Sequence, residues 1–423
     1  MNPFKEKAIP LERCIMDWKQ LYPAPYDKHT VDPYTRTRVI LMNGTEFEAN
    51  WYSHQFSRHC DNNDVRRQLA LLRRLEQQQQ KLISALKPLD ETILEHTIGY
   101  EQLAVDLTAF LARHEPDEYV KMALDFALLE DFDHLYRYAD LLDMDAGVKA
   151  ETLVGRYTEI MPGRPTIAHH RHPLDSIRRH ICDKDAALQT RLCVGIITAA
   201  EQQTMNYYMN VNAFYPTDRG RRLYQEIGMV EEQHVTQYGS LMDTNSTWLE
   251  GLLMHQYTEC YLYYSCMQTE TDAALRSVWE RLLAQEIAHL HAAAQLLEQV
   301  EGTHYCQVVG EGEFPEPLRL QSNVDYIRAV QGNSVQYTAA RECYACVNDL
   351  RPDVDFFRYQ SIVNNAIGQV TSHTVIEDYI RQFGEDYRFE TAPNPIAPLR
   401  DRRADNISVG RVPDSVECGK GLM

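Results

Sequence analysis

Three times in this sequence an acidic residue stands three positions before a histidine, within a segment whose apolar residues recur at helical spacing. The pairs are Asp131 with His134, Glu231 with His234, and Glu286 with His289. Residues three apart on an α-helix share a face, so each pair presents a carboxylate and an imidazole to one point. A fourth pair, Glu301 with His304, spans Gly302 and belongs to no helical pattern. The first three pairs predict helices that carry polar groups on their buried faces.

Apolar side chains flank each pair and place it on the core face of its helix. Around Glu231, for example, Tyr224, Ile227 and Tyr238 fall on the same face. An unpaired carboxylate buried in this way costs on the order of several kcal/mol, or takes up a proton. Buried carboxylates that converge with histidines indicate bound metal ions, because a cation then compensates their charge.

Each pair is accompanied by a glutamate on the core face of the helix before it. This glutamate precedes the tip of the expected helical hairpin by about as many residues as the acid-x-x-His pair follows it, so both reach the same depth. The candidate metal ligands are Glu101, Asp131, His134, Glu201, Glu231, His234, Glu259, Glu286 and His289.

Six long helices in three hairpins are expected, separated by proline, glycine and N-cap signals. The irregular stretch 144–185 lies between the first and second hairpins, and its tract His169 to His172 is expected to be structural. Most of the tyrosines near the ligand helices are expected to be core aromatics, and one or two to lie close to the metals. The expected hairpins are 89–113 with 117–143, 186–213 with 218–243, and 247–270 with 273–300.

The predicted fold class is mainly α, with less regular regions at both ends. Short β-like stretches such as Thr37 to Met42 and a turn signal at Asn43-Gly44 predict an irregular N-terminal lobe. Helices near 324–330 and 357–383 are expected in the C-terminal region. The expected domains are 1–63 for the lobe, 64–302 for the helical bundle, and 303–423 for the C-terminal helical region and its extended arm.

The net charge and the distribution of apolar residues argue against several classes of binding partner. A net charge of −19 argues against nucleic acid and anionic membranes, which are bound by basic surfaces. No apolar run is long enough to cross a membrane, and charged residues near the N-terminus argue against a signal peptide, so a cytoplasmic protein is expected. Cys343 and Cys346 form a single CxxC without the second pair that a zinc ribbon needs, and two thiols on a helix are expected.

The ligand pattern resembles that of the ferritin-like superfamily of di-iron carboxylate proteins, which includes bacterioferritins, rubrerythrins and ribonucleotide reductase small subunits. The resemblance covers about residues 89–300 and consists of one glutamate per leading helix and one acid-x-x-His per following helix. It implies that the acid of each acid-x-x-His pair bridges two metal ions. It also implies that the leading glutamate and the histidine are terminal ligands. Asp131 departs from the usual glutamate, which puts its bridging role in doubt.

Two choices of hairpins for the metal site stay open at this point. The long crossover at 144–185 and the 100-residue spacing between equivalent ligands favour the first and second hairpins. The usual form of the motif, Glu-x-x-His, favours the second and third hairpins, since both carry it. A second or intersubunit site is the remaining possibility. Glu201, Glu231 and His234 belong to both pairings.

The expected function is redox chemistry with dioxygen or peroxide at two iron ions, with manganese or a mixed pair as variants. A small-molecule substrate or an external electron donor would supply electrons, and a homodimer is possible. The alternative is a non-enzymatic protein that binds or handles iron. A storage cage is disfavoured, because the chain is much longer than a single four-helix bundle.

Overall fold

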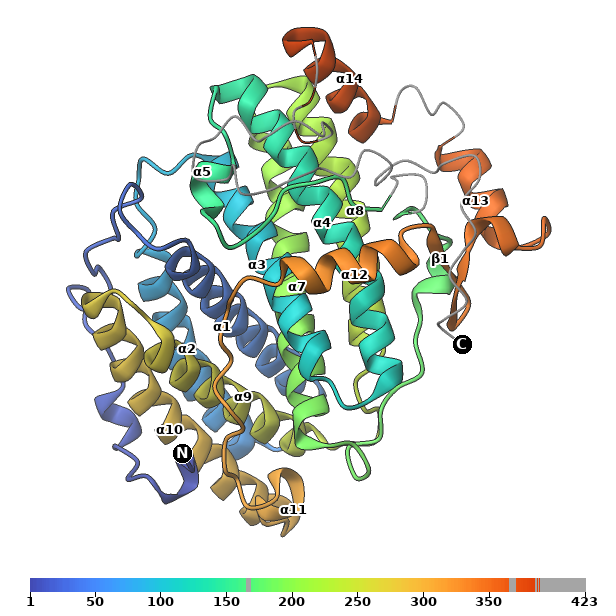
Figure 1. The fold of residues 1–423 in the computed structure, drawn as a ribbon. Helices are drawn as coiled ribbons and strands as arrows, with labels where there is room; N and C mark the ends of the chain where they lie inside the picture. The colour runs from blue at the N-terminus through green and yellow to red at the C-terminus, as the bar shows by residue number, and fades with distance from the viewer. Residues whose placement is uncertain (165–168, 365–369, 385, 387, 389–423) are drawn as a thin grey trace. The chain divides into compact units, whose positions relative to one another are not determined.

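The computed structural model describes residues 1–164, 169–364, 370–384, 386 and 388 (Figure 1). These residues are almost entirely helical, apart from one two-stranded hairpin. The predicted mainly α class is therefore confirmed. The extended arm predicted from Thr391 onward lies outside the described residues.

All six long helices predicted from the sequence are present. Thr92 and Thr247 each cap one of these helices in a capping box, with Glu95 and Glu250 as the reciprocal partners. The helices are α3 (Ile93–His114), α4 (Glu118–Ala146), α7 (Leu188–Phe214), α8 (Asp218–Gly239), α9 (Trp248–Thr269) and α10 (Ala273–Glu301).

The irregular N-terminal lobe was a wrong prediction for residues 33–59, which form helix α1 (Pro33–His59). Thr37 to Met42 and the expected turn at Asn43-Gly44 lie inside this helix. Both faces of α1 are buried from Tyr34 to Met42, so no amphipathic stripe marks it as a helix. A second helix, α2 (Asn63–Ser84), follows where the sequence predicted one.

The chain forms two compact units, each assembled from separate stretches of sequence. Helix α7 runs through the division, which falls between Gln203 and Thr204. The units cut across the domains expected from the sequence, because α1 belongs with helices far along the chain. Unit 1 comprises 1–91, 180–203 and 242–319, and unit 2 comprises 92–179, 204–241 and 320–423.

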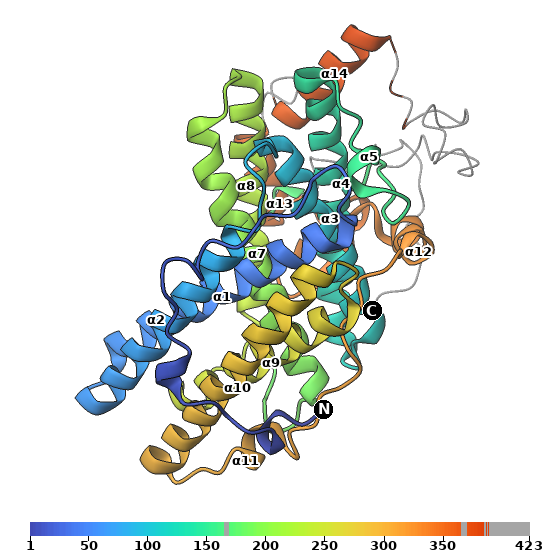
Figure 2. The ribbon, with the colours of Figure 1, turned by 90° about the vertical axis from the view of Figure 1, so that its left-hand side faces the viewer.

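In unit 1, two hairpins build a four-helix bundle. Helix α1 packs along α2, and α9 packs along α10; α1 also contacts α9, and α2 contacts α10. Figures 1 and 2 both show these four helices running alongside one another. Leu69, Leu72 and Leu75 on α2 are almost fully buried in this bundle. The short helix α11 (Cys306–Val309) contacts α9.

In unit 2, α3 packs along α4, and α4 contacts α8. The part of α7 after Gln203 packs on α8, where Tyr208 and Met209 lie against Gly228. Two later helices, α12 (Val324–Ser334) and α14 (Thr371–Phe383), pack on α4. The core of this unit is therefore organised around α4, which carries two of the candidate ligands.

The C-terminal region has helices where the sequence predicted them, together with a short strand hairpin. Helix α12 confirms the helix expected near 324–330, and the described part of the range 357–383 includes α13 (Asp355–Val363) and α14. Strands β1 (Tyr337–Ala340) and β2 (Cys343–Cys346) pair antiparallel. The CxxC pair therefore lies on a strand, not on a helix; Cys343 is a free thiol, but Cys346 is disulfide-bonded.

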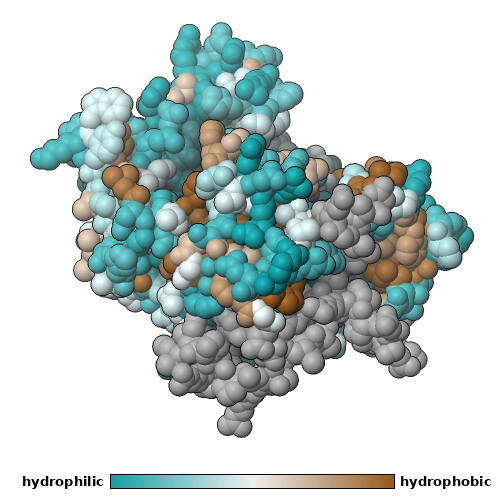
Figure 3. Space-filling model, turned by 90° about the horizontal axis from the view of Figure 1, so that it is seen from above, coloured by the Kyte–Doolittle hydropathy of each residue, from teal (hydrophilic) through white to brown (hydrophobic). Residues whose placement is uncertain are grey.

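The molecular face in Figure 3 is mainly hydrophilic where its residues are described, with small hydrophobic patches between polar side chains. Among the described residues, no helix has both the length and the apolar character that crossing a membrane requires.

Candidate metal centre

Two groups of potential metal ligands meet in the structure, and Glu231 belongs to both. The first joins Glu231 to Glu101 and His134, and the second joins it to Asp131, Glu201 and His234. In each group, one ligand atom per residue lies within 4.8 Å of every other. All six side chains are at most 1% exposed. The arrangement offers two neighbouring positions for a cation, with one carboxylate common to them.

Helix α7 brings Glu201 to the second group. Glu201 lies three residues before Thr204, where the unit 2 part of the same unbroken helix begins. The other five ligands belong to unit 2, on α3, α4 and α8.

Both histidines turn their Nδ1 atoms toward Glu231. Nδ1 of His134 lies 2.9 Å from Oε1 of Glu231. Nδ1 of His234 lies 3.2 Å from Oε2 of Glu231 and 3.2 Å from Oδ1 of Asp131. Burial opposes the ionisation of Glu231, but hydrogen bonds from His134 and His234 lower its pKa to about 2. Glu231 is therefore an anion between two imidazole rings.

A buried carboxylate, Glu130, fixes the orientation of His234. Nε2 of His234 lies 2.7 Å from Oε2 of Glu130. A carboxylate that accepts a hydrogen bond from one ring nitrogen holds the imidazole ring in place, which is how proteins orient histidines that bind metals. Here the other nitrogen is Nδ1, which faces Asp131 and Glu231.

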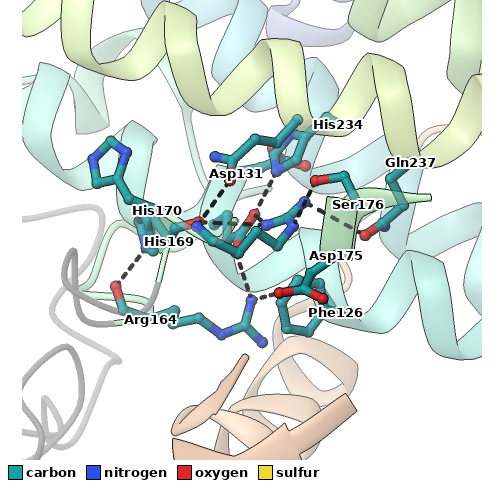
Figure 4. A network of polar contacts seen from close by, with 12 residues as sticks. Phe126, Asp131, Arg164, His169, His170, Asp175, Ser176, His234 and Gln237 are labelled. Atoms are coloured by element: carbon teal, nitrogen blue, oxygen red, sulfur yellow. Dashed lines mark hydrogen bonds and ion pairs between the residues drawn. The ribbon is translucent and has the colours of Figure 1, made fainter. Parts of the chain in front are cut away.

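Two arginines compensate the charge of Glu130. Nη1 of Arg171 donates to both carboxylate oxygens of Glu130 at 3.0 Å, and Nη1 of Arg164 lies 3.3 Å from Oε1. Burial would raise the pKa of Glu130, but Arg171, His234 and Arg164 together hold it well below its usual value. Figure 4 shows Arg164 and His234 approaching this network from opposite sides. Both guanidinium groups also lie over the ring of Phe126.

The crossover between α4 and α7 supplies these arginines. Arg164 donates its backbone N–H to the carbonyl of Leu129 on α4, and Gly163 donates its N–H to Oδ1 of Asp133. His169 lies 2.8 Å from the carbonyl oxygen of Arg164. His169, His170 and Arg171 are buried, so this part of the tract is a structural loop and not a solvated one.

Gly163 lies so close to α4 that no side chain fits there. A Cβ atom at this position would come closer than 3.0 Å to the carbonyl oxygen of Leu129 and the amide nitrogen of Asp133. Because helix backbone cannot yield as a flexible side chain can, Gly163→Ala is expected to lower the free energy of unfolding by about 1–3 kcal/mol. Urea denaturation would measure the change.

Gly195 provides the matched control for this substitution. It lies inside α7, and a Cβ atom there would meet nothing within 4 Å. Gly195→Ala is therefore expected to leave stability unchanged or raise it by up to about 1 kcal/mol, since alanine favours helix. Equal stability of the two variants would contradict the close approach of Gly163 to α4.

The donor set fits bound metal ions. The side chain of Asp131 is fully buried; its Oδ1 lies 3.2 Å from Nδ1 of His234, whereas its Oδ2 has no hydrogen-bond partner among the described residues. Burial raises the pKa of Asp131 above its usual value, with the charge of His234 opposing the shift. A buried carboxylate with an unsatisfied oxygen, beside histidines and further carboxylates, is explained by a cation that these ligands hold.

Buried tyrosines line the unit 2 site next to Glu101. The hydroxyl of Tyr208 donates to Oε1 of Glu101. The ring of Tyr138 lies 5.3 Å from that of Tyr208 and 4.9 Å from that of Tyr224, measured between centroids. The prediction that one or two tyrosines lie close to the ligands thus agrees with Tyr208, whose hydrogen bond fixes the orientation of the Glu101 carboxylate.

The third hairpin belongs to unit 1. Its ligands Glu259, Glu286 and His289 lie on α9 and α10, which pack with α1 and α2. Neither of the two ligand groups found among the described residues includes a residue of the third hairpin. His255, four residues before Glu259 on α9, lines a cavity of unit 1.

Sequence reasoning missed Glu130, Arg164 and Arg171. Glu130 directly precedes Asp131, and a helical pattern alone does not say which of two adjacent acids meets a histidine from another helix. Arg164 and Arg171 lie in an irregular stretch without periodicity. A signal was available in the crossover 144–185, where five arginines stand in a segment that also contains several prolines and histidines.

Comparisons with known proteins give no independent information on this site. The sequence matches no protein-family model, and neither curated proteins nor solved structures give a match to the chain.

Proposed function

We propose that unit 2, completed by Glu201, is a ferritin-like bundle that binds two iron ions and reacts with dioxygen or peroxide. The observation that carries this proposal is that two groups of ligands share the carboxylate of Glu231. A carboxylate common to two such groups suits a pair of metal ions, and manganese or a mixed pair would use the same ligands.

The order of the ligands along the chain supports the ferritin-like assignment. A glutamate on each leading helix is followed by an acid-x-x-His on the next helix, and the four helices bring these residues to one place. Glu101 and His134 would bind one ion, and Glu201 and His234 the other. Asp131 belongs to the second group alone, as expected from a side chain shorter than glutamate.

Bound iron would supply the redox chemistry with dioxygen or peroxide. The protein's own contribution is to orient the ligands and to exclude water. Glu130 orients His234, and Tyr208 orients Glu101. The burial of all six ligands keeps bulk water away from the ions. Electrons would come from a substrate or a separate reductase, because the sequence lacks the two CxxC pairs of a rubredoxin-like centre.

Retention of ferrous iron and consumption of oxygen by the protein test this proposal. Apoprotein loaded with ferrous iron without oxygen, and then desalted, is expected to retain iron, to consume oxygen on exposure to air and to gain near-ultraviolet absorption. The double variant Glu231→Gln/His234→Gln, which keeps side-chain size nearly constant, is expected to lose the oxygen consumption. Oxygen consumption equal to that of the wild type in this variant would overturn the proposal.

The same experiment separates catalysis from iron handling. A catalytic centre takes up iron until its ligands are filled and then turns over with a reductant. A storage or handling protein instead continues to accumulate ferric iron with each addition. Continued uptake without turnover would therefore favour the non-enzymatic alternative.

A further inference from the structure

Unit 1 buries a second cluster of ionisable side chains at the centre of its four-helix bundle. Glu46 comes from α1, Glu76 from α2, Glu259 from α9, and Glu286 with His289 from α10. Each of these five side chains is at most 1% exposed. Four carboxylates in one apolar bundle carry far more negative charge than one imidazole can compensate.

Hydrogen bonds link members of this cluster, and the negative charges of its carboxylates affect one another. Nε2 of Gln256 donates to Oε1 of Glu76 and to Oε2 of Glu259, both at 2.8 Å. Burial raises the pKa of Glu259 well above its usual value, and the nearby charges of Glu286, Glu46 and Glu76 raise it further. The charges of carboxylates on the other three helices thus reach Glu259, although the ligand atoms of this cluster are spaced more widely than those of the two groups around Glu231.

The partners that a metal-free cluster would need are missing. The second oxygens of Glu46, Glu76 and Glu286 make no hydrogen bond within the part of the chain that the structure describes. His289, with Nδ1 2.8 Å from Oε1 of Glu286, provides the ion pair to the cluster; over the described ranges no lysine or arginine pairs with these carboxylates. An anionic cluster without such cations needs bound cations or protons.

Gln79 is an independent sign of a missing ligand. It follows Glu76 by three positions, so both side chains lie on one face of α2. Gln79 is 0% exposed, and neither its amide oxygen nor its amide nitrogen has a hydrogen-bond partner among the described residues. A buried amide with both ends unsatisfied is costly unless a ligand meets it.

The positions repeat the order found in unit 2. Leading glutamates on α1 and α9 are each followed, on the next helix, by a glutamate and a nitrogen-bearing side chain three residues later. On α10 that side chain is His289, as in the acid-x-x-His motif. On α2 it is Gln79, where the corresponding helix of unit 2 has His134. Unit 1 therefore offers more oxygen donors and one imidazole fewer.

We propose that this cluster is a second metal site, which binds a divalent cation that prefers oxygen ligands, such as Mn²⁺. Carboxylate and amide oxygens suit harder cations, whereas imidazole favours iron and the later transition metals. The proposal does not depend on redox chemistry in unit 2.

A cavity in unit 1 lies beside helices that carry the cluster, although none of the five cluster side chains lines it. It has a volume of about 270 Å³, and Thr45 on α1 and Thr258 on α9 both line it. These threonines directly precede Glu46 and Glu259 in the sequence. Glu48 also lines the cavity, and its charge contributes to the raised pKa of Glu259. The cavity thus extends to the level of the cluster, and the acidic residue Glu48 belongs to its lining.

Mn²⁺ binding to the full chain, followed by electron paramagnetic resonance and by metal content after desalting, tests the proposal. The acid-x-x-His pair of each unit gives two matched variants, Glu286→Gln/His289→Gln in unit 1 and Glu231→Gln/His234→Gln in unit 2. The unit 1 variant is expected to lose a class of Mn²⁺ sites that the unit 2 variant keeps. Unchanged Mn²⁺ binding in a folded unit 1 variant would overturn the proposal.

Gln79→His keeps the test decisive if the unit 1 variant fails to fold. In the Glu231→Gln/His234→Gln background, this substitution adds an imidazole ligand, so bound Co²⁺ is expected to change its visible absorption and to bind more tightly than in the same background with Gln79. An unaltered Co²⁺ spectrum would show that Gln79 does not reach a metal. Loss of oxygen chemistry in unit 2 alone would leave these results unaffected.

Discussion

Replacing Arg171 by methionine is expected to lower the free energy of unfolding by about 3–5 kcal/mol. The substitution removes the guanidinium group that donates to both oxygens of Glu130, and the carboxylate stays buried. Arg164, with its Nη1 3.3 Å from Oε1 of Glu130, compensates only part of that charge. Denaturant unfolding at neutral pH, followed by circular dichroism, would measure the loss.

A second substitution shows whether the charge of Glu130 is the cause. The double variant Arg171→Met/Glu130→Gln removes the unpaired charge, so it is expected to recover a large part of the stability that Arg171→Met loses. The recovered protein should still bind iron less tightly, because Glu130 also orients His234. An Arg171→Met protein as stable as the wild type would show that Glu130 does not need this arginine.

Glu231→Ala is expected to abolish iron binding at both positions of unit 2, whereas Glu101→Ala removes a ligand from one position only. The reason is that Glu231 belongs to both ligand groups and Glu101 to a single one. Iron content after desalting and the rate of oxygen consumption would measure the difference. Glu101→Ala is expected to retain the ion held by Asp131, Glu201 and His234.

The comparison between these two variants is informative even if both are less stable. Both replace a fully buried glutamate by alanine, so they leave cavities of similar size. Thermal unfolding of each apoprotein measures that shared cost separately from metal binding. Equal iron loss in both variants would contradict the shared role of Glu231.

The long amphipathic helices could be predicted from the sequence because local signals fix them. Helix α10 runs from its N-cap Asp272 to Gly302, and the glycine adopts the left-handed conformation that ends helices. The expected range 273–300 differs from the observed Ala273–Glu301 by one residue. Convergence of the ligands from the first two hairpins was one of the two pairings that the sequence left open, favoured by the long crossover at 144–185 and by the 100-residue spacing.

Helix α1 could not be predicted in this way, since tertiary partners satisfy its polar residues. Arg36 pairs with Glu91, and the hydroxyl of Thr35 donates to Glu270, a residue far along the chain. Such pairs bury polar side chains on every face and erase the helical period. Gly44, which indicates a turn by composition, instead lets the helix pass close to Gln203.

The second cluster was only partly visible for the same reason. Glu259, Glu286 and His289 stood out through their motif, but Glu46 lies on the unrecognised helix α1. Glu76 is followed by Gln79 and so forms no acid-x-x-His pair. Which hairpins associate depends on long-range packing, and no local pattern encodes the choice between α3–α4 and α1–α2 as the partner of α9–α10.

The interleaved order of the two units has a consequence for synthesis of the protein on the ribosome. Helices α1 and α2 are made early, yet the α9–α10 hairpin that completes their bundle is translated only after much of unit 2. Until then, Leu69, Leu72 and Leu75 lack their final packing partners. Such distant pairing slows folding and leaves apolar surface open to aggregation. We therefore expect the nascent chain to depend on chaperones until α10 has left the ribosome.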